Sequence, residues 1–242
     1  MIIDSHIHCG KNHPFIPISL LLRSAGIESA CLFAPVEEIY DRFDYNFQDS
    51  SEWQRKRKEA NHYLLNLAKG KTDIFPYLFV WNDFDVDELS LGFKGIKWHR
   101  HEYEPNYNYH DKRCHQLIER IIELNLPIVL EESYSNTINF INKLAPRATV
   151  IIPHLGRLNG GFPSLDDSGI WKKENIYADS ALAFTSEIEV FLRKYGSDKL
   201  LFGSDFPFGL PSSELKKILS LTISDLDKEK ILGLNIMRLL GF

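Results

Sequence analysis

Eight short runs of apolar, β-branched and aromatic residues recur along the 242-residue chain, and turn residues bound each of them. Within the runs apolar and polar residues alternate only weakly, as expected for strands that are covered on both faces. Eight buried parallel strands in one chain of this length constrain the fold strongly. The predicted strands are residues 1–6, 30–34, 75–81, 95–99, 127–131, 149–154, 175–180 and 200–204.

Helical patterns separate the predicted strands. The clearest lies at residues 112–125, where Leu117, Ile118 and Ile121 begin one apolar stripe. Further helices are predicted at 51–69, 136–144, 185–195 and 212–221, with a C-terminal helix at 225–240. Repeated strand–helix units predict a (β/α)₈ TIM barrel, slightly distorted, forming a single domain over residues 1–242. An open doubly wound sheet is the alternative, but it needs fewer strands and a glycine-rich first turn that this chain lacks.

Composition narrows the class of protein. The chain is 44% hydrophobic and 25% charged, with a net charge of −5 and a pI near 6.0. No basic field favours nucleic acid or an anionic membrane, so we expect a small-molecule substrate. Cys9, Cys31 and Cys114 form no disulfide framework, which indicates a reducing compartment. Without a signal-peptide pattern or a long apolar run, the chain is expected to be cytoplasmic.

Polar residues stand at the ends of the predicted strands, where parallel barrels place their active sites. Asp4, His6 and His8 end the first strand and, at a spacing of two, are expected to share one face. The fourth strand ends in Lys97 and His99, the fifth in Glu131, the sixth in His154 and the eighth in Asp205. Imidazole and carboxylate groups that converge on one mouth predict a divalent metal site. We expect zinc first, with manganese or iron as alternatives.

The chain also resembles the amidohydrolase superfamily, in the branch that includes lactone hydrolases and decarboxylases of the aminocarboxymuconate-semialdehyde type. The matching stretches are IDSHIH, GFKGIKWH, NLPIVLEE, IPHLGR, ENIYADSA, LLFGSDFPFG and ILGLNIMRLLGF, and they run in family order through nearly the whole chain. The resemblance implies a (β/α)₈ barrel with a divalent metal ion at its mouth.

Carried over by position, the resemblance implies metal-site roles for His6, His8, His154 and Asp205. His6 and His8 would be ligands, His154 a ligand or a group that polarises the substrate, and Asp205 a ligand that also accepts a proton from water. The chain departs from the family at one position, because Glu131 stands where the fifth strand usually carries a histidine. A carboxylate there can still ligate the ion, and it favours a harder metal.

Substrate contacts are predicted from groups near the same strand ends. Arg100, His99 and Arg157 are candidates to hold a substrate carboxylate, since a guanidinium matches a carboxylate bidentately. Lys97 is a further candidate. Alternatively, a carboxylated Lys97 would bridge two ions together with Glu131 or a neighbouring residue. We interpret His13, His62, His101, His110 and His115 as structural or surface residues, although the tyrosine-rich loop around His101 could line a pocket.

The aromatic and acidic segment 36–51 is expected to form a lid over the mouth, and the aromatics of residues 40–47 within it would suit a homodimer interface or such a lid. The favoured function is metal-dependent hydrolysis of a small lactone, ester or amide, with a carboxylate as one expected substrate feature. Nonoxidative decarboxylation on the same site is the second hypothesis. A binding or regulatory barrel with a decayed site is the third, and only the Glu131 replacement supports it.

Overall fold

Eight parallel strands follow one another in sequence order around a barrel, in a computed structural model that describes residues 1–242. Hydrogen bonds from Ser5 N to Phe202 O (2.9 Å) and from Asp205 N to His6 O (2.8 Å) bring the two ends of the sheet together. The predicted (β/α)₈ barrel is therefore confirmed, in a nearly closed form. The strands are β1 (Ile3–His8), β2 (Ser29–Phe33), β3 (Ile74–Phe79), β4 (Gly95–His99), β5 (Ile128–Glu131), β6 (Val150–Ile152), β7 (Ile176–Asp179) and β8 (Leu200–Leu201).

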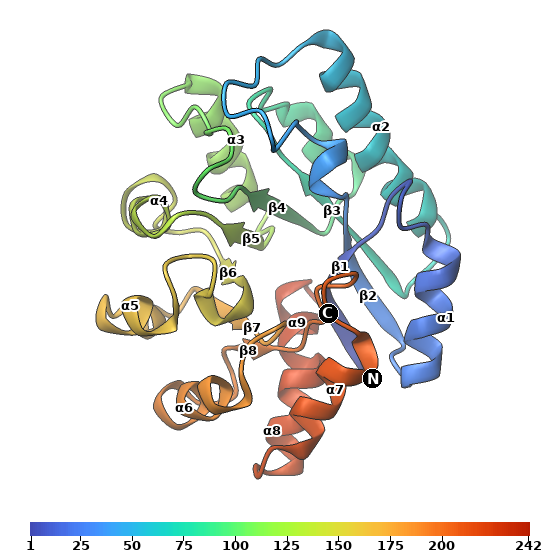
Figure 1. Cartoon of the computed structure of the whole chain (residues 1–242), viewed down its shortest axis with the longest axis vertical. Coiled ribbons are helices and arrows are strands. Elements are labelled where there is room, and N and C mark those ends of the chain that lie inside the picture. Colours follow the sequence, from blue (N-terminus) through green and yellow to red (C-terminus); the bar gives the residue numbers. More distant parts are fainter.

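Helices surround the strands (Figure 1). The α-helices are α1 (Phe15–Ala25), α2 (Ser51–Ala68), α3 (Lys112–Glu123), α4 (Tyr134–Asn139), α5 (Phe162–Asp167), α6 (Thr185–Tyr195), α7 (Pro211–Ser220), α8 (Asp225–Glu229) and α9 (Asn235–Leu239). Short 3₁₀ segments are η1 (Val36–Glu38), η2 (Val86–Leu91), η4 (Pro153–Gly156) and η5 (Ile170–Lys172), and π-helical turns are η3 (Phe140–Leu144) and η6 (Lys230–Leu234). No helix has both the length and the apolar character needed to cross a membrane.

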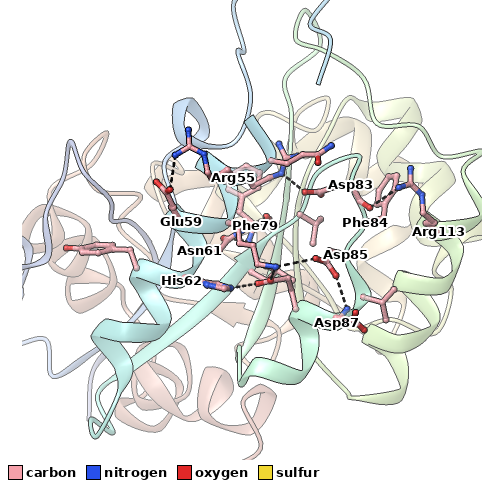
Figure 2. A pocket seen from close by; sticks show the side chains of 18 of the residues that line it. Arg55, Glu59, Asn61, His62, Phe79, Asp83, Phe84, Asp85, Asp87 and Arg113 are labelled. Atoms are coloured by element: carbon pink, nitrogen blue, oxygen red, sulfur yellow. Dashed lines mark hydrogen bonds and ion pairs between the residues drawn. The ribbon is translucent and has the colours of Figure 1, made fainter. Parts of the chain in front are cut away.

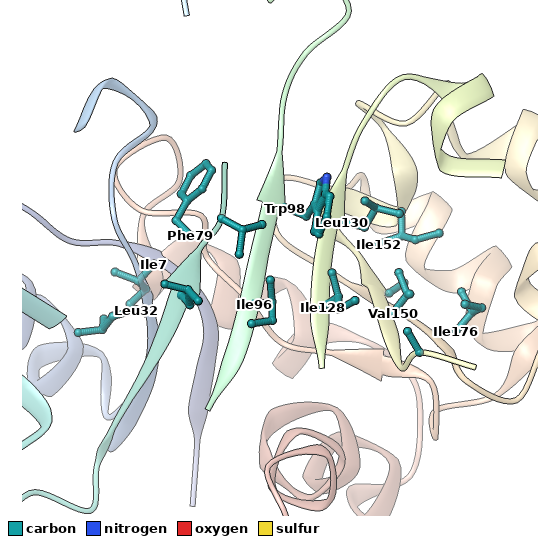
Figure 3. Packing of buried hydrophobic residues seen from close by; sticks show 14 of the residues in the cluster. Ile7, Leu32, Phe79, Ile96, Trp98, Ile128, Leu130, Val150, Ile152 and Ile176 are labelled. Carbon is teal, nitrogen blue, oxygen red and sulfur yellow. The ribbon is translucent and has the colours of Figure 1, made fainter. Parts of the chain in front are cut away.

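Apolar side chains fill both faces of the sheet, which explains the weak alternation in the sequence. Along β4, Ile96 and Trp98 alternate with Lys97 and His99, so the first pair packs toward the helices and the second points into the barrel. Figure 3 shows the layer between sheet and helices. A smaller cluster fills the barrel below the mouth: Ile3, Cys31, Phe33, Phe75, Tyr77, Val129, Ile151, Leu201 and Ile236.

The C-terminal helix predicted at 225–240 is present over residues 225–239 and contains a π-helical turn. It is divided into α8, η6 and α9, and Gly233 lies within the π-helical turn. A Cβ on Gly233 would lie 2.3 Å from the carbonyl oxygen of Met1. Gly233 thus permits the C-terminal helices to pass against the start of β1, the strand that carries the first two predicted metal ligands.

Between β3 and β4 the only helical element is η2, and a polar groove of about 1060 Å³ lies beside it and α2 (Figure 2). Arg57 of α2 is buried at this groove. Its guanidinium donates to Asp83 (2.9 Å), to Asp49 (2.8 Å) and to the carbonyl of Ile39 (2.7 Å). Arg57 therefore anchors both ends of the segment between η1 and α2, which lies at the barrel mouth.

Replacing Arg57 by Ala should lower the free energy of unfolding by about 2–3 kcal/mol, because a buried carbonyl and two carboxylates lose their partner. Urea titration followed by circular dichroism measures the change. Arg55→Ala is the matched control, since Arg55 is exposed and pairs only with Glu59 (3.3 Å), and it should cost less than about 0.5 kcal/mol. Equal effects of the two substitutions would contradict the anchoring role.

Candidate metal centre and active site

β1 carries two histidines into the barrel, and a bulge separates them from Asp4. The register of β1 against β2 shifts between Asp4 and Ile7, which reorients the side chains that follow. Asp4 Oδ1 accepts hydrogen bonds from the backbone N–H groups of Ser204 (2.9 Å) and His6 (3.1 Å). The expectation that Asp4 shares a face with His6 and His8 is therefore wrong, because a regular strand was assumed.

Asp205, which follows β8 next to β1, and His154, which follows β6, both approach the two histidines. Asp205 Oδ1 lies 3.3 Å from His6 Nε2 and 3.2 Å from His8 Nε2, and Asp205 Oδ2 lies 3.8 Å from His154 Nε2. The rings of His6 and His154 stack with centroids 5.1 Å apart. These four residues, all buried, are called the inner cluster below.

Two members of the inner cluster have an unusual backbone conformation. His154 has φ +57° and Asp205 has φ +55°, in the left-handed region that costs a non-glycine residue about 1–3 kcal/mol. Gly203 precedes Asp205 where space is short, because a Cβ there would lie 3.0 Å from the Cβ of His6. Strained residues of this kind concentrate at functional sites.

Asp179, at the end of β7, orients the inner cluster. Its Oδ2 accepts a hydrogen bond from His6 Nδ1 over 2.8 Å, and its Oδ1 accepts from the backbone N–H groups of His154 (2.9 Å) and Ala181 (3.1 Å). His154 Nδ1 donates in turn to the carbonyl of Ala181 (2.9 Å). With Nδ1 held by these acceptors on both rings, Nε2 is the nitrogen that each ring directs toward Asp205 and can offer to an ion.

Burial and charge set the protonation of this cluster. Burial lowers the pKa of His6 to about 4, so its ring is neutral at physiological pH. Burial also opposes charge on His154, but hydrogen bonding to Glu131 and the charges of Glu131, Asp179 and Asp205 outweigh it and raise the pKa to about 9. Burial likewise opposes charge on Asp205, yet His6 and His8 hold its pKa well below the usual range.

The inner cluster fits a divalent metal ion. It offers imidazole nitrogens and a carboxylate at one point, and the ligand atoms of His6, His154 and Asp205 lie within 4.8 Å of one another. The hydrogen bond from His6 Nδ1 to a buried carboxylate is the arrangement that fixes the tautomer of metal-ligating histidines. This chemistry of the donor set supports the site predicted from the strand ends.

Glu131 borders the inner cluster together with Lys97. Glu131 Oε2 lies 3.6 Å from His154 Nε2 and 3.3 Å from Lys97 Nζ, and Lys97 Nζ lies 3.2 Å from His6 Nε2. Burial opposes charge on Glu131, but the charges of His99 and Lys97 hold its pKa well below the usual range. Lys97 is fully buried and does not line the pocket, so its position argues against the predicted contact with substrate.

A pocket of about 210 Å³ opens above the inner cluster. Phe33 supports the site from β2, with its ring edge-on to His6 at 5.0 Å. The lining combines charged, imidazole and apolar groups: His8, His13, Pro35, Val36, Glu37, Arg42, His99, His101, Glu131, His154, Leu158, Leu182, Asp205, Pro207 and Phe208. This volume suits a small molecule.

The two arginines predicted to hold substrate lie outside this pocket. The guanidinium of Arg100 is buried, where it donates to Glu132 (3.0 Å) and to backbone carbonyls of the loop that follows β4. Arg157 is exposed and lies over the ring of Phe184 at 5.2 Å. Their positions argue against both predicted contacts, whereas His99 does line the pocket.

Two loop residues that sequence reasoning did not assign contribute instead. His101 Nε2 lies 2.7 Å from Glu131 Oε1, although His101 was interpreted as structural or surface. Arg42, from the predicted lid segment, contacts His101 Nδ1 over 2.9 Å and donates to Glu104 over 2.7 Å. In the same segment Tyr40 is buried and stacks on Trp81, while Phe43 and Tyr45 are exposed. The homodimer stays a prediction.

Comparison with protein families gives one match over nearly the whole chain: the family described as Amidohydrolase matches residues 3–242. No curated protein matches the sequence. Among solved structures, the dihydroxybenzoic acid decarboxylase from Polaromonas, with bound manganese and the inhibitor 2-nitroresorcinol, superposes with a TM-score of 0.78. It is 17% identical in sequence, and the alignment covers 99% of this chain and 96% of that one.

Two further structures are similar at the same level. The 2,6-dihydroxybenzoate decarboxylase from Rhizobium has a TM-score of 0.76 and 16% identity, with 99% of this chain and 98% of that chain covered. A protein assigned as a 2-pyrone-4,6-dicarboxylic acid hydrolase, from Pseudomonas putida, has a TM-score of 0.76 and 17% identity, with 99% and 97% covered. At these identities the likeness concerns the fold, and it extends to both hydrolases and decarboxylases.

Replacing Asp179 by Asn should weaken binding of a divalent ion about 10–100-fold, because the amide no longer holds the proton on His6 Nδ1. Titration of the metal-free protein against a competing chelator measures the affinity. Asp166→Asn is the control, since Asp166 bonds to Lys194 and Tyr195 and belongs to neither the inner cluster nor the pocket. Unchanged affinity in Asp179→Asn would show that Asp179 does not orient a ligand.

Proposed function

This chain belongs to the amidohydrolase family, and from that premise we propose that it is a metal-dependent hydrolase acting on a small lactone, ester or amide. The observation that carries the proposal is the inner cluster, in which Nε2 of His6, His8 and His154 converges on the carboxylate of Asp205. The proposed ligands are His6, His8, His154 and Asp205, with Glu131 beside them.

We propose zinc as the ion. Three imidazoles and one carboxylate form a donor set typical of zinc, and the Nδ1 hydrogen bonds of His6 and His154 prepare the rings for ligation. Glu131 adds a second carboxylate at 3.6 Å from His154 Nε2. A harder donor set of this kind also suits manganese or iron, and one neighbour in fold contains manganese.

Asp205 and His154 have different roles in the proposed hydrolysis. A bound divalent ion supplies a water of lowered pKa and an electrophile for a carbonyl oxygen. Asp205, whose Oδ atoms face three imidazoles, accepts the proton of the attacking water and returns it to the leaving group. His154 lines the pocket, and in the alternative role, with Nε2 protonated instead of bound to the ion, it donates to the carbonyl oxygen as negative charge develops there.

The pocket wall sets the class of substrate. Arg42 and His13 line the pocket and, in place of Arg100 and Arg157, provide positive or hydrogen-bonding groups for a substrate carboxylate. The same pocket is also lined by the apolar side chains of Leu158, Leu182 and Phe208. We therefore propose a compact substrate that joins a carbonyl group, a carboxylate and an apolar ring or chain.

Nonoxidative decarboxylation is the second candidate. The ring of Phe208 stands edge-on to His8 at 6.0 Å, which offers an aromatic contact next to the inner cluster. Two neighbours in fold are decarboxylases of dihydroxybenzoates. A binding barrel with a decayed site is less well supported, because all four proposed ligands of the inner cluster are present. Glu131 also carries a carboxylate that can itself ligate a metal ion.

Metal content and product identity test the proposal together. The purified protein should contain a divalent ion and turn over a panel of lactones and aryl carboxylates. Asp205→Asn should lower kcat/KM at least about 100-fold, because the proton acceptor is lost. His6→Ala should lose the ion, measured by elemental analysis, while exposed His110→Ala should keep both ion and activity.

The products separate the two reactions, since hydrolysis adds water and decarboxylation releases CO₂. Release of CO₂ from an aryl carboxylate, with no lactone or ester turnover, would transfer the assignment to the second candidate. Metal retained unchanged in His6→Ala would overturn the metal site.

A further inference from the structure

A second group of ligand atoms lies beside the inner cluster. Glu131 Oε1 is 3.2 Å from His99 Nε2 and 2.7 Å from His101 Nε2, and the three ligand atoms lie within 4.8 Å of one another. His99 comes from the end of β4, Glu131 from the end of β5, and His101 from the loop that follows β4. All three line the pocket. They are called the outer triad below.

Glu131 connects the two groups through different oxygens. Its Oε1 faces His99 and His101, whereas its Oε2 faces His154 (3.6 Å) and Lys97 (3.3 Å). A carboxylate that presents one oxygen to each of two neighbouring donor sets has the geometry of a bridge between two metal ions, which in two-metal sites lie about 3.5–4 Å apart.

We propose that the outer triad is a second divalent-cation site and that Glu131 bridges it to the ion of the inner cluster. The inference rests on the proposed function, because it takes the inner ion as given. It assigns a ligand role to His101, which the strand-end pattern does not mark, and it gives a physical reason for a carboxylate at position 131. A carboxylate has two oxygens and can bind two neighbouring ions at once, which the imidazole of a histidine at position 131 could not do in this way.

The surroundings of the outer triad favour a cation. Glu37 and Glu131 line this side of the pocket, and Glu104 Oε1 lies 3.3 Å from His101 Nδ1. The one guanidinium here, Arg42, is paired with Glu37 and Glu104. The ammonium of Lys97 lies on the Oε2 side of Glu131, away from the two histidines.

The two histidines of the outer triad can adopt the tautomer in which Nε2 is free to bind an ion. Arg42 donates to His101 Nδ1 over 2.9 Å, so in this arrangement His101 Nε2 carries the proton that Glu131 accepts. Binding an ion at Nε2 moves that proton to Nδ1, where Glu104 Oε1 can accept it in place of Arg42. His99 Nε2 shares its proton with Glu131 Oε1 (3.2 Å), and because His99 Nδ1 has no hydrogen-bond partner, moving that proton to Nδ1 displaces no other contact.

Titration of the metal-free full-length protein with Mn²⁺ tests the inference. Calorimetry and elemental analysis should give two ions per chain, and electron paramagnetic resonance should show the coupled signal of a manganese pair. His101→Gln and His99→Gln should each reduce the stoichiometry to one and give the signal of an isolated ion. The matched control His110→Gln, in the same loop but exposed, should still bind two.

The outcomes separate this inference from the proposed function. One ion in the unmodified protein, unchanged in both outer-triad variants, would overturn the second site and leave the inner site intact. It would mean that His101 and Glu131 form only a hydrogen bond. Absence of any bound ion would overturn the inner site and the second site together. Two ions that persist in both variants would also contradict the assignment of these ligands.

Discussion

A buried hydrogen bond of 2.8 Å from His6 Nδ1 to Asp179 Oδ2 decides which nitrogen β1 presents to the centre of the barrel. The same carboxylate accepts the backbone N–H of His154, so one side chain at the end of β7 positions ligands on two other strands. A buried imidazole nitrogen needs a partner, and without an ion the partner of His6 Nε2 is Lys97 Nζ at 3.2 Å. A cation at this point satisfies Asp205 and the rings together, and the rest of the site is arranged around that requirement.

The parts of this account that the sequence predicted rest on regular geometry. Strands that recur with helices between them can close into a barrel in sequence order, and parallel strands bring their carboxyl ends to one mouth. His6, His154 and Asp205 could therefore be placed together without a structure. The departure at Glu131 was also visible, because it occupies a defined position at the end of β5. What its two oxygens contact could not be read from position alone.

The residues that sequence reasoning missed depend on irregular backbone or on loop paths. A bulge turns Asp4 away from the histidines of its own strand. The two-residue alternation of side chains along a regular strand does not predict where a bulge occurs. Arg100 follows a strand end but folds back into the loop beyond it. His101 and Arg42 reach the pocket from loops, whose course is set by tertiary contacts such as those of Arg57. The helix α1 was likewise unpredicted, because its exposed face carries Ile16 and Leu20 and gives a weak amphipathic signal.

X-ray absorption spectroscopy of the metal-loaded protein reports the atoms bound to the ion, and it therefore tests whether histidine nitrogens ligate the metal. We expect a mixed nitrogen and oxygen environment with the multiple-scattering pattern of at least two imidazoles, together with carboxylate oxygen. An ion surrounded only by oxygen, with no imidazole scattering, would contradict the claim that Asp179 and the strand ends prepare histidine nitrogens for a metal.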